Sequence, residues 1–170
     1  MVRADAAMTD PSQHSKSVLY AEDDENDTFF MQRAFIRLEK PDVLYVVGDG
    51  NEAVNYLETT RTAIQQGQAQ PLRLVLLDVK MPYRSGLEVL EWVRQCPEFS
   101  SLLVVMLTSS MLEADIAFAA EKGANAYLSK PINSDDLITL IDTLLSTCFA
   151  EPTPTGRLNL PGNALPAVHS

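Results

Sequence analysis

The sequence predicts an α/β fold in which helices cover both faces of a parallel β-sheet. Five short apolar runs alternate along the chain with five longer segments whose apolar residues recur at helical spacing. The run at residues 102–107 is apolar throughout, as expected for a strand buried on both faces. Since right-handed crossovers place each helix on a face of the sheet, this alternation favours a parallel sheet.

The first strand and the first helix are predicted at the start of the folded region. Residues 18–21 (VLYA) form an apolar run, and apolar residues then recur at helical spacing over residues 30–38. Asn26 and Asp27 are candidates for the helix cap, and Pro41 follows the last helical position.

The next three elements continue the alternation. Residues 43–47 predict the second strand, which the turn at 48–50 (GDG) closes. Residues 53–64 predict the second helix, followed by a polar, glutamine-rich linker that ends at Pro71. Residues 72–77 predict the third strand.

The last five elements follow with short connections. Helical spacing appears at residues 87–93, 116–120 and 137–145, and the intervening apolar runs at 102–107 and 126–128 predict the fourth and fifth strands. This alternation predicts a three-layer sandwich of five strands and five helices. Among such folds we expect the flavodoxin-like one, in which the strand order is 2-1-3-4-5.

The two ends of the chain lack this periodicity. Residues 1–16 predict a flexible N-terminal tail, and residues 150–170, with four Pro and two Gly, predict a disordered C-terminal tail. The folded domain is accordingly expected to span residues 17–149.

Composition excludes several classes of function. The 23 acidic and 13 basic residues give a net charge of −10, which disfavours binding to nucleic acid or anionic lipid. No apolar run approaches the roughly 20 residues of a membrane span, so a cytoplasmic protein without a membrane partner is expected. Both histidines, His14 and His169, lie near the termini, which argues against Ser/His/Asp triads and histidine-ligated zinc in the folded region. Cys96 and Cys148 lack the spacing of a thiolate metal site.

Polar residues follow four of the five predicted strands. They are Glu22, Asp23 and Asp24 after the first, Asp78 after the third, Thr108 after the fourth and Lys130 after the fifth. If the first and third strands are neighbours, the carboxylates converge, and Mg²⁺ is the cation that best suits oxygen ligands in a wet cleft. Lys130 and Thr108 could hold phosphoryl oxygens, and Asp78 could receive the phosphoryl group. The simpler interpretation of residues 22–24 is a solvated acidic turn that caps a helix.

Four segments carry a resemblance to a known family. VLYAEDDEND (18–27), LVLLDVKMPYRSGLEVL (74–90), VVMLTSS (104–110) and GANAYLSKPI (123–132) resemble the motifs of receiver domains in two-component response regulators. The likeness covers about residues 17–148. Within the family, the chain resembles stand-alone regulators, including those paired with bacterial phytochromes.

The resemblance implies a role for each site residue. Asp78 would be the phosphoacceptor, and Thr108 and Lys130 would contact the phosphoryl oxygens. Asp23 would bind the metal directly and Glu22 would bind it through a water molecule. Asp78 and the backbone carbonyl of Lys80 would complete the set. Thr108 and Tyr127 would form the conformational switch, and the Lys130–Pro131 peptide bond would be cis.

The resemblance also implies partners. A sensor histidine kinase, which could be of the phytochrome type, or a phosphotransfer protein would supply the phosphoryl group. In the family such partners dock on the first helix, where Phe29 and Ile36 lie beside the apolar stripe. The fourth helix, fifth strand and fifth helix would form a face for a partner or a second copy, giving a homodimer. The chain would signal through these contacts and would not turn over a free substrate.

Two alternatives remain open. The first is a magnesium-dependent phosphatase of the haloacid-dehalogenase type, but its motif needs a second Asp where this chain has Lys80. The second is a degenerate receiver that serves only as a scaffold, although the acidic and lysine positions of the site are all present.

Overall fold

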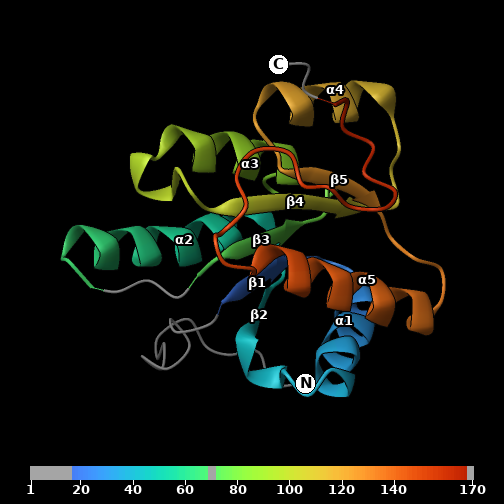
Figure 1. Ribbon diagram of the computed structural model, residues 1–170. Helices are drawn as coiled ribbons and strands as arrows, with labels where there is room; N and C mark the ends of the chain where they lie inside the picture. Colours follow the sequence, from blue (N-terminus) through green and yellow to red (C-terminus); the bar gives the residue numbers. More distant parts are fainter. Residues whose placement is uncertain (1–16, 69–71, 168–170) are drawn as a thin grey trace.

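The computed structural model describes residues 17–68 and 72–167. Strands and helices alternate in the predicted order (Figure 1). The strands are β1 (Val18–Ala21), β2 (Leu44–Val47), β3 (Leu74–Leu77), β4 (Leu103–Thr108) and β5 (Ala126–Ser129). The helices are α1 (Glu25–Arg37), α2 (Gly50–Gln65), α3 (Gly86–Gln95), α4 (Glu113–Glu121) and α5 (Ser134–Cys148), with short 3₁₀ turns at Pro41–Val43 and Pro97–Phe99.

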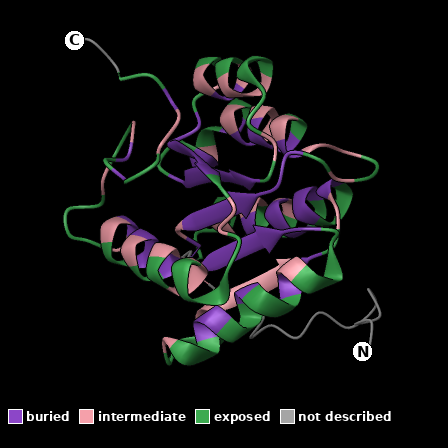
Figure 2. Cartoon of the chain, turned by 90° about the vertical axis from the view of Figure 1, so that its right-hand side faces the viewer, coloured by how far each residue is buried: buried purple, intermediate pink, exposed green. Residues whose placement is uncertain are grey.

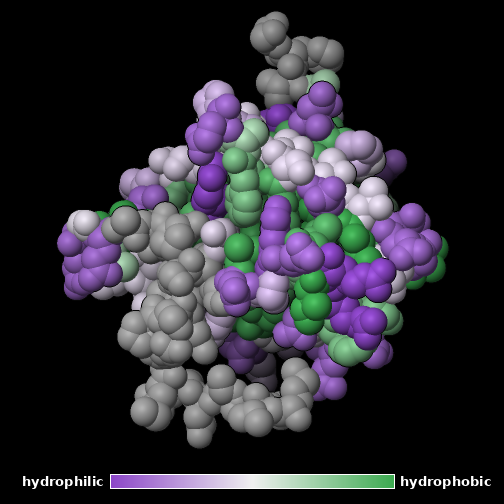
Figure 3. Space-filling view, turned by 60° about the horizontal axis from the view of Figure 1, so that its bottom comes forward, coloured by the Kyte–Doolittle hydropathy of each residue, from purple (hydrophilic) through white to green (hydrophobic). Residues whose placement is uncertain are grey.

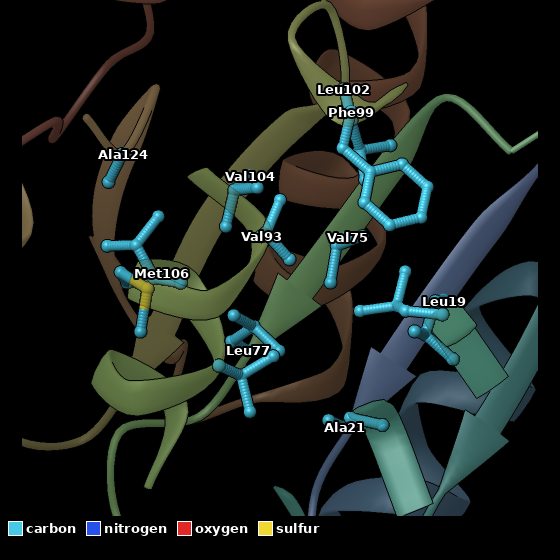
Figure 4. Packing of buried hydrophobic residues seen from close by; sticks show 14 of the residues in the cluster. Leu19, Ala21, Val75, Leu77, Val93, Phe99, Leu102, Val104, Met106 and Ala124 are labelled. Carbon is cyan, nitrogen blue, oxygen red and sulfur yellow. The ribbon is translucent and has the colours of Figure 1, made fainter. Parts of the chain in front are cut away.

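The five strands form one parallel sheet in the order β2-β1-β3-β4-β5, which confirms the predicted fold. Helices α1 and α5 lie on one side of the sheet, and α2, α3 and α4 lie on the other (Figure 1). Side chains alternate along each strand, so that Leu19, Val75 and Val104 pack on the α2–α4 side (Figure 4), and their neighbours pack toward α1 and α5. Strands β1, β3 and β4 are therefore buried on both faces, whereas most residues of the edge strand β2 are only partly buried (Figure 2).

Polar residues just beyond the strands begin most of the helices. The side chain of Asp24 accepts hydrogen bonds from the backbone N–H groups of Asn26 and Asp27, so Asp24 caps α1 and the expected caps are wrong. Asp49 and Ser85 cap α2 and α3 in the same way. Asp24 and Asp49 follow their strands within three residues, so the ends of β1 and β2 and the N-termini of α1 and α2 share one edge of the molecule.

The C-terminal segment departs from the expectation of a disordered tail. Residues 151–167 are described, and Leu158, Leu160 and Leu165 in this segment are buried. Leu158 and Leu160 join the apolar cluster beside α5, whereas Leu165 joins the cluster on the opposite side of the sheet. The segment therefore crosses the outer edge of β5 from one layer to the other (Figure 1).

Hydrogen bonds fix this crossing segment to β5 and its surroundings. The N–H of Leu158 donates to the carbonyl of Asn125 at 2.8 Å, and the N–H of Ala164 donates to that of Tyr127 at 2.9 Å. The guanidinium of Arg157 donates to the carbonyl of Ala124 at 2.5 Å. An edge strand has unpaired backbone groups, and three leucines have apolar area to bury, so proline-rich composition does not keep this segment free.

The helices in the described ranges are all too short or too polar to cross a membrane. The expected N-terminal tail, residues 1–16, lies outside the described residues. The predicted long linker after the second helix is helical as far as Gln65, and residues 69–71 within it also lie outside.

Candidate functional site

Three carboxylates meet where β1 and β3 end. The register of these parallel neighbours pairs Ala21 with Leu77, which places Glu22 and Asp78 side by side. Together with Asp23, they offer oxygens that all lie within 4.8 Å of one another. Glu22 is 2% exposed and Asp78 is 6% exposed, whereas Asp23 is open to solvent. This donor set fits a hard divalent cation that keeps part of its water shell.

Lys130 supplies the positive charge of the site. Its Nζ lies 2.5 Å from Glu22 Oε2, 2.7 Å from Asp27 Oδ2 and 3.1 Å from Asp78 Oδ2. Lys130 follows β5 directly, and its backbone N–H donates to the carbonyl of Thr108 at 2.9 Å. The residues that follow β1, β3 and β5 therefore bring their charged side chains together, whereas β4 is linked to Lys130 through the backbone carbonyl of Thr108.

Burial and hydrogen bonds shift the pKa values of Glu22 and Lys130. Burial raises the pKa of Glu22 to about 7, in spite of the hydrogen bonds it accepts from Lys130 and from the backbone of Asp24. Burial acts to lower the pKa of Lys130, but hydrogen bonds to Asp27 and Glu22 outweigh it and raise the pKa above its ordinary value. The ammonium is thus held charged among acidic side chains.

The acidic run after β1 divides between two roles. Asp24 caps α1, as the simpler interpretation of that run proposes. Glu22 and Asp23 instead face Asp78. Asp27 was missed as a site residue because it reads as a cap. Because α1 begins at Glu25, Asp27 lies in the first turn of the helix, above the strand ends. This position follows only from the observed start of α1.

Thr108 and Tyr127 meet at one residue. The N–H of Ser110 donates to Thr108 Oγ1 at 3.1 Å, and the Tyr127 hydroxyl donates to the carbonyl of Ser110 at 2.7 Å. Both Thr108 and Tyr127 are buried, so the tyrosine ring lies inward in this structure. Burial raises the pKa of Tyr127 to about 12. The switch role of the pair stays a prediction.

The family assignment follows from comparison of the whole chain. Residues 18–142 match the response regulator receiver domain. The chain belongs to this family. Response regulator Rcp1 of Synechocystis sp. is 31% identical over 142 residues, which cover 82% of this chain and 92% of Rcp1.

Solved structures of receiver proteins share the fold. The Mn²⁺-bound form of Rcp1 matches with a TM-score of 0.65 and 29% identity, covering 82% of this chain and 98% of that structure. Response regulator RPA3017, of red light signalling in R. palustris, matches with a TM-score of 0.66 and 31% identity, covering 85% and 99%. The bacteriophytochrome response regulator AtBRR is 34% identical, with a TM-score of 0.58 and coverage of 75% and 90%.

One expectation for this receiver domain is wrong. Among the described residues the cis peptide bond is Glu151–Pro152, so Lys130–Pro131 is not cis. The expectation rested on the resemblance alone, whereas an X-Pro bond prefers the trans form by roughly 0.5–1 kcal/mol. The part assigned to the Lys80 carbonyl remains a prediction; Lys80 follows Asp78 by two residues.

Proposed function

We propose that this receiver domain accepts a phosphoryl group on Asp78 in a magnesium-dependent reaction. The observation that carries the proposal is the contact of Lys130 Nζ with both Glu22 and Asp78 beside the convergent oxygens of Asp23. One Asp78 oxygen would attack the phosphorus of a phosphohistidine. The phosphorus–nitrogen bond breaks, the imidazole nitrogen keeps the electron pair, and an acyl phosphate forms on Asp78.

The residues around Asp78 would divide the electrostatic work. Glu22, Asp23, Asp78 and the Lys80 carbonyl would hold Mg²⁺, whose charge offsets that of the phosphoryl oxygens. The name of the Rcp1 structure records Mn²⁺ in that relative, which supports a divalent cation here. Lys130 and Thr108 would contact the remaining phosphoryl oxygens, Lys130 through its charge and Thr108 through its hydroxyl.

The phosphoryl donor would be a partner protein. The described residues contain no histidine, so the phosphohistidine would come from a sensor histidine kinase or a phosphotransfer protein. The name of AtBRR, a bacteriophytochrome response regulator, supports a kinase of the phytochrome type, and the red light signalling named for RPA3017 is consistent with it. Transfer from such a partner leaves the acyl phosphate on this chain, which acts as a signal and not as a turnover enzyme.

An apolar surface beside the site suits that partner. Phe29, Phe30 and Ile36 on α1 are exposed, and Ile132 in the loop before α5 is fully exposed. Figure 3 shows hydrophobic side chains among hydrophilic ones on the side of the molecule that carries α1 and α5. A groove of about 210 Å³ between these helices has apolar, basic and acidic side chains in its lining, among them Phe29, Phe30, Ile138, Arg33, Arg37 and Asp135, so that bases outnumber acids by two to one. A helix with apolar and acidic side chains would complement this surface.

Output would pass through the face formed by α4, β5 and α5. The crossing segment lies over the edge of β5, so a partner or second copy at that edge would contact this segment or displace it. A homodimer through this face remains a prediction. It would bury either the crossing segment or, once that segment is displaced, the edge of β5.

The decisive experiment is labelling with a small phosphodonor. The protein with Mg²⁺ and acetyl phosphate should gain one phosphoryl group by intact mass, and Asp78→Asn should gain none while keeping its fold. Label on the Asp78→Asn variant would refute the assignment. Multiple-turnover hydrolysis of a phosphomonoester would favour the phosphatase alternative, and absence of both labelling and cation binding would favour the scaffold.

A further inference from the structure

Lys130 has a third carboxylate partner outside the acidic group at Asp78. An ammonium has three N–H donors, and the carboxylates of Glu22, Asp27 and Asp78 lie within hydrogen-bond distance of Lys130 Nζ. The contact to Asp27, at 2.7 Å, is shorter than the one to Asp78, at 3.1 Å. Asp27 thus binds the ammonium at least as closely as the proposed acceptor does.

Asp27 differs from the other two partners in its place and in its other contacts. Glu22 and Asp78 belong to the group of carboxylates within 4.8 Å of one another, and Asp27 does not. Asp27 and Lys130 instead line a cavity of about 290 Å³ that none of the three grouped acids lines. In the described part of the chain, the Asp27 carboxylate forms a hydrogen bond with Lys130 and with no other side chain.

The backbone under Asp27 is firmly held. Its N–H donates to Asp24 Oδ1 at 3.0 Å, within the cap that begins α1. The following turns of α1 bury Met31, Ala34 and Phe35 in the core. A lysine side chain loses up to about 2 kcal/mol of rotamer entropy when it is fixed, so a rigid acceptor close to its end restricts it efficiently.

We propose that Asp27 is a positioning residue that holds the Lys130 ammonium for phosphoryl transfer. This inference rests on the proposed function of Asp78. When the phosphoryl group is on Asp78, the N–H that faced the Asp78 carboxylate turns to a phosphoryl oxygen, and Glu22 is shared with the proposed cation. Asp27 has neither of these other roles, so it keeps the ammonium in place before and after transfer.

The test compares Asp27→Ala with Glu25→Ala and Asp27→Glu. Glu25 lies in the same helical turn, is exposed and carries the same charge, so Glu25→Ala is a matched control for charge removal. With acetyl phosphate and saturating Mg²⁺, Asp27→Ala should phosphorylate on the order of tenfold more slowly than wild type. Glu25→Ala should match wild type, and Asp27→Glu should restore most of the rate.

A second readout does not depend on phosphorylation. In the metal-free protein, the ¹⁵N-detected signal of the Lys130 ammonium should be sharp in wild type and in Glu25→Ala, and exchange-broadened in Asp27→Ala. Equal rates and equal Lys130 signals in the two alanine variants would overturn the proposal. A slower rate in Asp27→Ala would also overturn it if the unfolded fraction of that variant accounts for the whole loss. If wild type takes no label at Asp78, the proposed function fails, and the Lys130 signal still decides whether Asp27 holds the ammonium.

Discussion

The side-chain oxygen of Asn163 accepts a hydrogen bond of 3.0 Å from the backbone N–H of Tyr127. The carbonyl of Tyr127 in turn accepts from the N–H of Ala164 at 2.9 Å. The Asn163 amide also donates to the carbonyl of Leu158 at 3.0 Å, which closes the crossing segment on itself. Both backbone groups of the candidate switch residue are therefore bound by the C-terminal segment.

Removing this side chain should loosen the segment. We expect Asn163→Ala to lower the free energy of unfolding by about 1–2 kcal/mol, because the partly buried N–H of Tyr127 loses its acceptor. Urea denaturation measures this loss. Asn159→Ala is the matched control, since Asn159 is exposed in the same segment. Equal stability of the two variants would show that the Asn163 contacts do not hold the segment.

Removing the ammonium should destabilise the metal-free protein. In Lys130→Ala the buried carboxylates of Glu22 and Asp78 would lose their shared partner, at a cost of about 3–5 kcal/mol in unfolding free energy. Mg²⁺ should then stabilise the variant more than it stabilises wild type, because it offsets an uncompensated charge. Unfolding with EDTA and with Mg²⁺ tests both statements. Lys122→Ala, which breaks the exposed pair with Glu91, should cost less than about 1 kcal/mol.

Gly86 should tolerate no side chain. A Cβ at this position would lie 1.9 Å from the carbonyl oxygen of Asp78, so α3 could not approach the end of β3. We expect Gly86→Ala to lose more than about 2 kcal/mol of stability and to phosphorylate slowly. At Gly48 a Cβ would meet only the flexible end of Glu52 at 3.3 Å, and Gly48→Ala should be nearly neutral. Similar thermal melts for both variants would contradict the close approach.

The exposed edge of α1 should matter to the partner and not to the fold. Phe29 is 51% exposed, so Phe29→Ala should change stability by less than about 0.5 kcal/mol. Transfer from the cognate kinase should slow several-fold, while labelling by acetyl phosphate stays unchanged. Leu112→Ala, at an exposed apolar position before α4, should leave kinase transfer intact. Unchanged transfer to Phe29→Ala would remove this residue from the docking surface.

Cys148 should make stability fall in alkali. Burial raises the pKa of its thiol to about 11, so the folded chain keeps a proton that the unfolded chain releases nearer to pH 9. Between these values the native state binds more protons, and its stability falls as the pH rises. Wild type should therefore lose up to about 2 kcal/mol more than Cys148→Ala between pH 9 and pH 11. Parallel stability curves for the two proteins would contradict this prediction.

Most of the fold could be predicted because its signals are local. Each strand is a short apolar run, and alternation with helical spacing is sufficient to indicate a parallel sheet covered on both sides. Helix starts were less accessible. Asp24, Asn26 and Asp27 can all cap a helix, and the choice of Asp24 depends on where the chain leaves β1.

The candidate site was largely predictable because strand ends of a parallel sheet share one edge. Glu22, Asp23 and Asp78 are brought together, and Lys130 contacts two of them. Asp27 could not be found in this way, since it lies on a helix and its contact with Lys130 spans the distance from α1 to the loop after β5.

The sequence by itself determined the sheet, the order of its elements and the acidic and basic residues at the strand ends, because these depend on periodicity and spacing along the chain. Only the tertiary structure decided the partners of Lys130 and the position of residues 156–165 against β5. Both depend on contacts between residues far apart in sequence. Composition predicted a loose tail because it records proline and glycine, whereas the free edge of β5 and the apolar space beside it exist only in the folded chain.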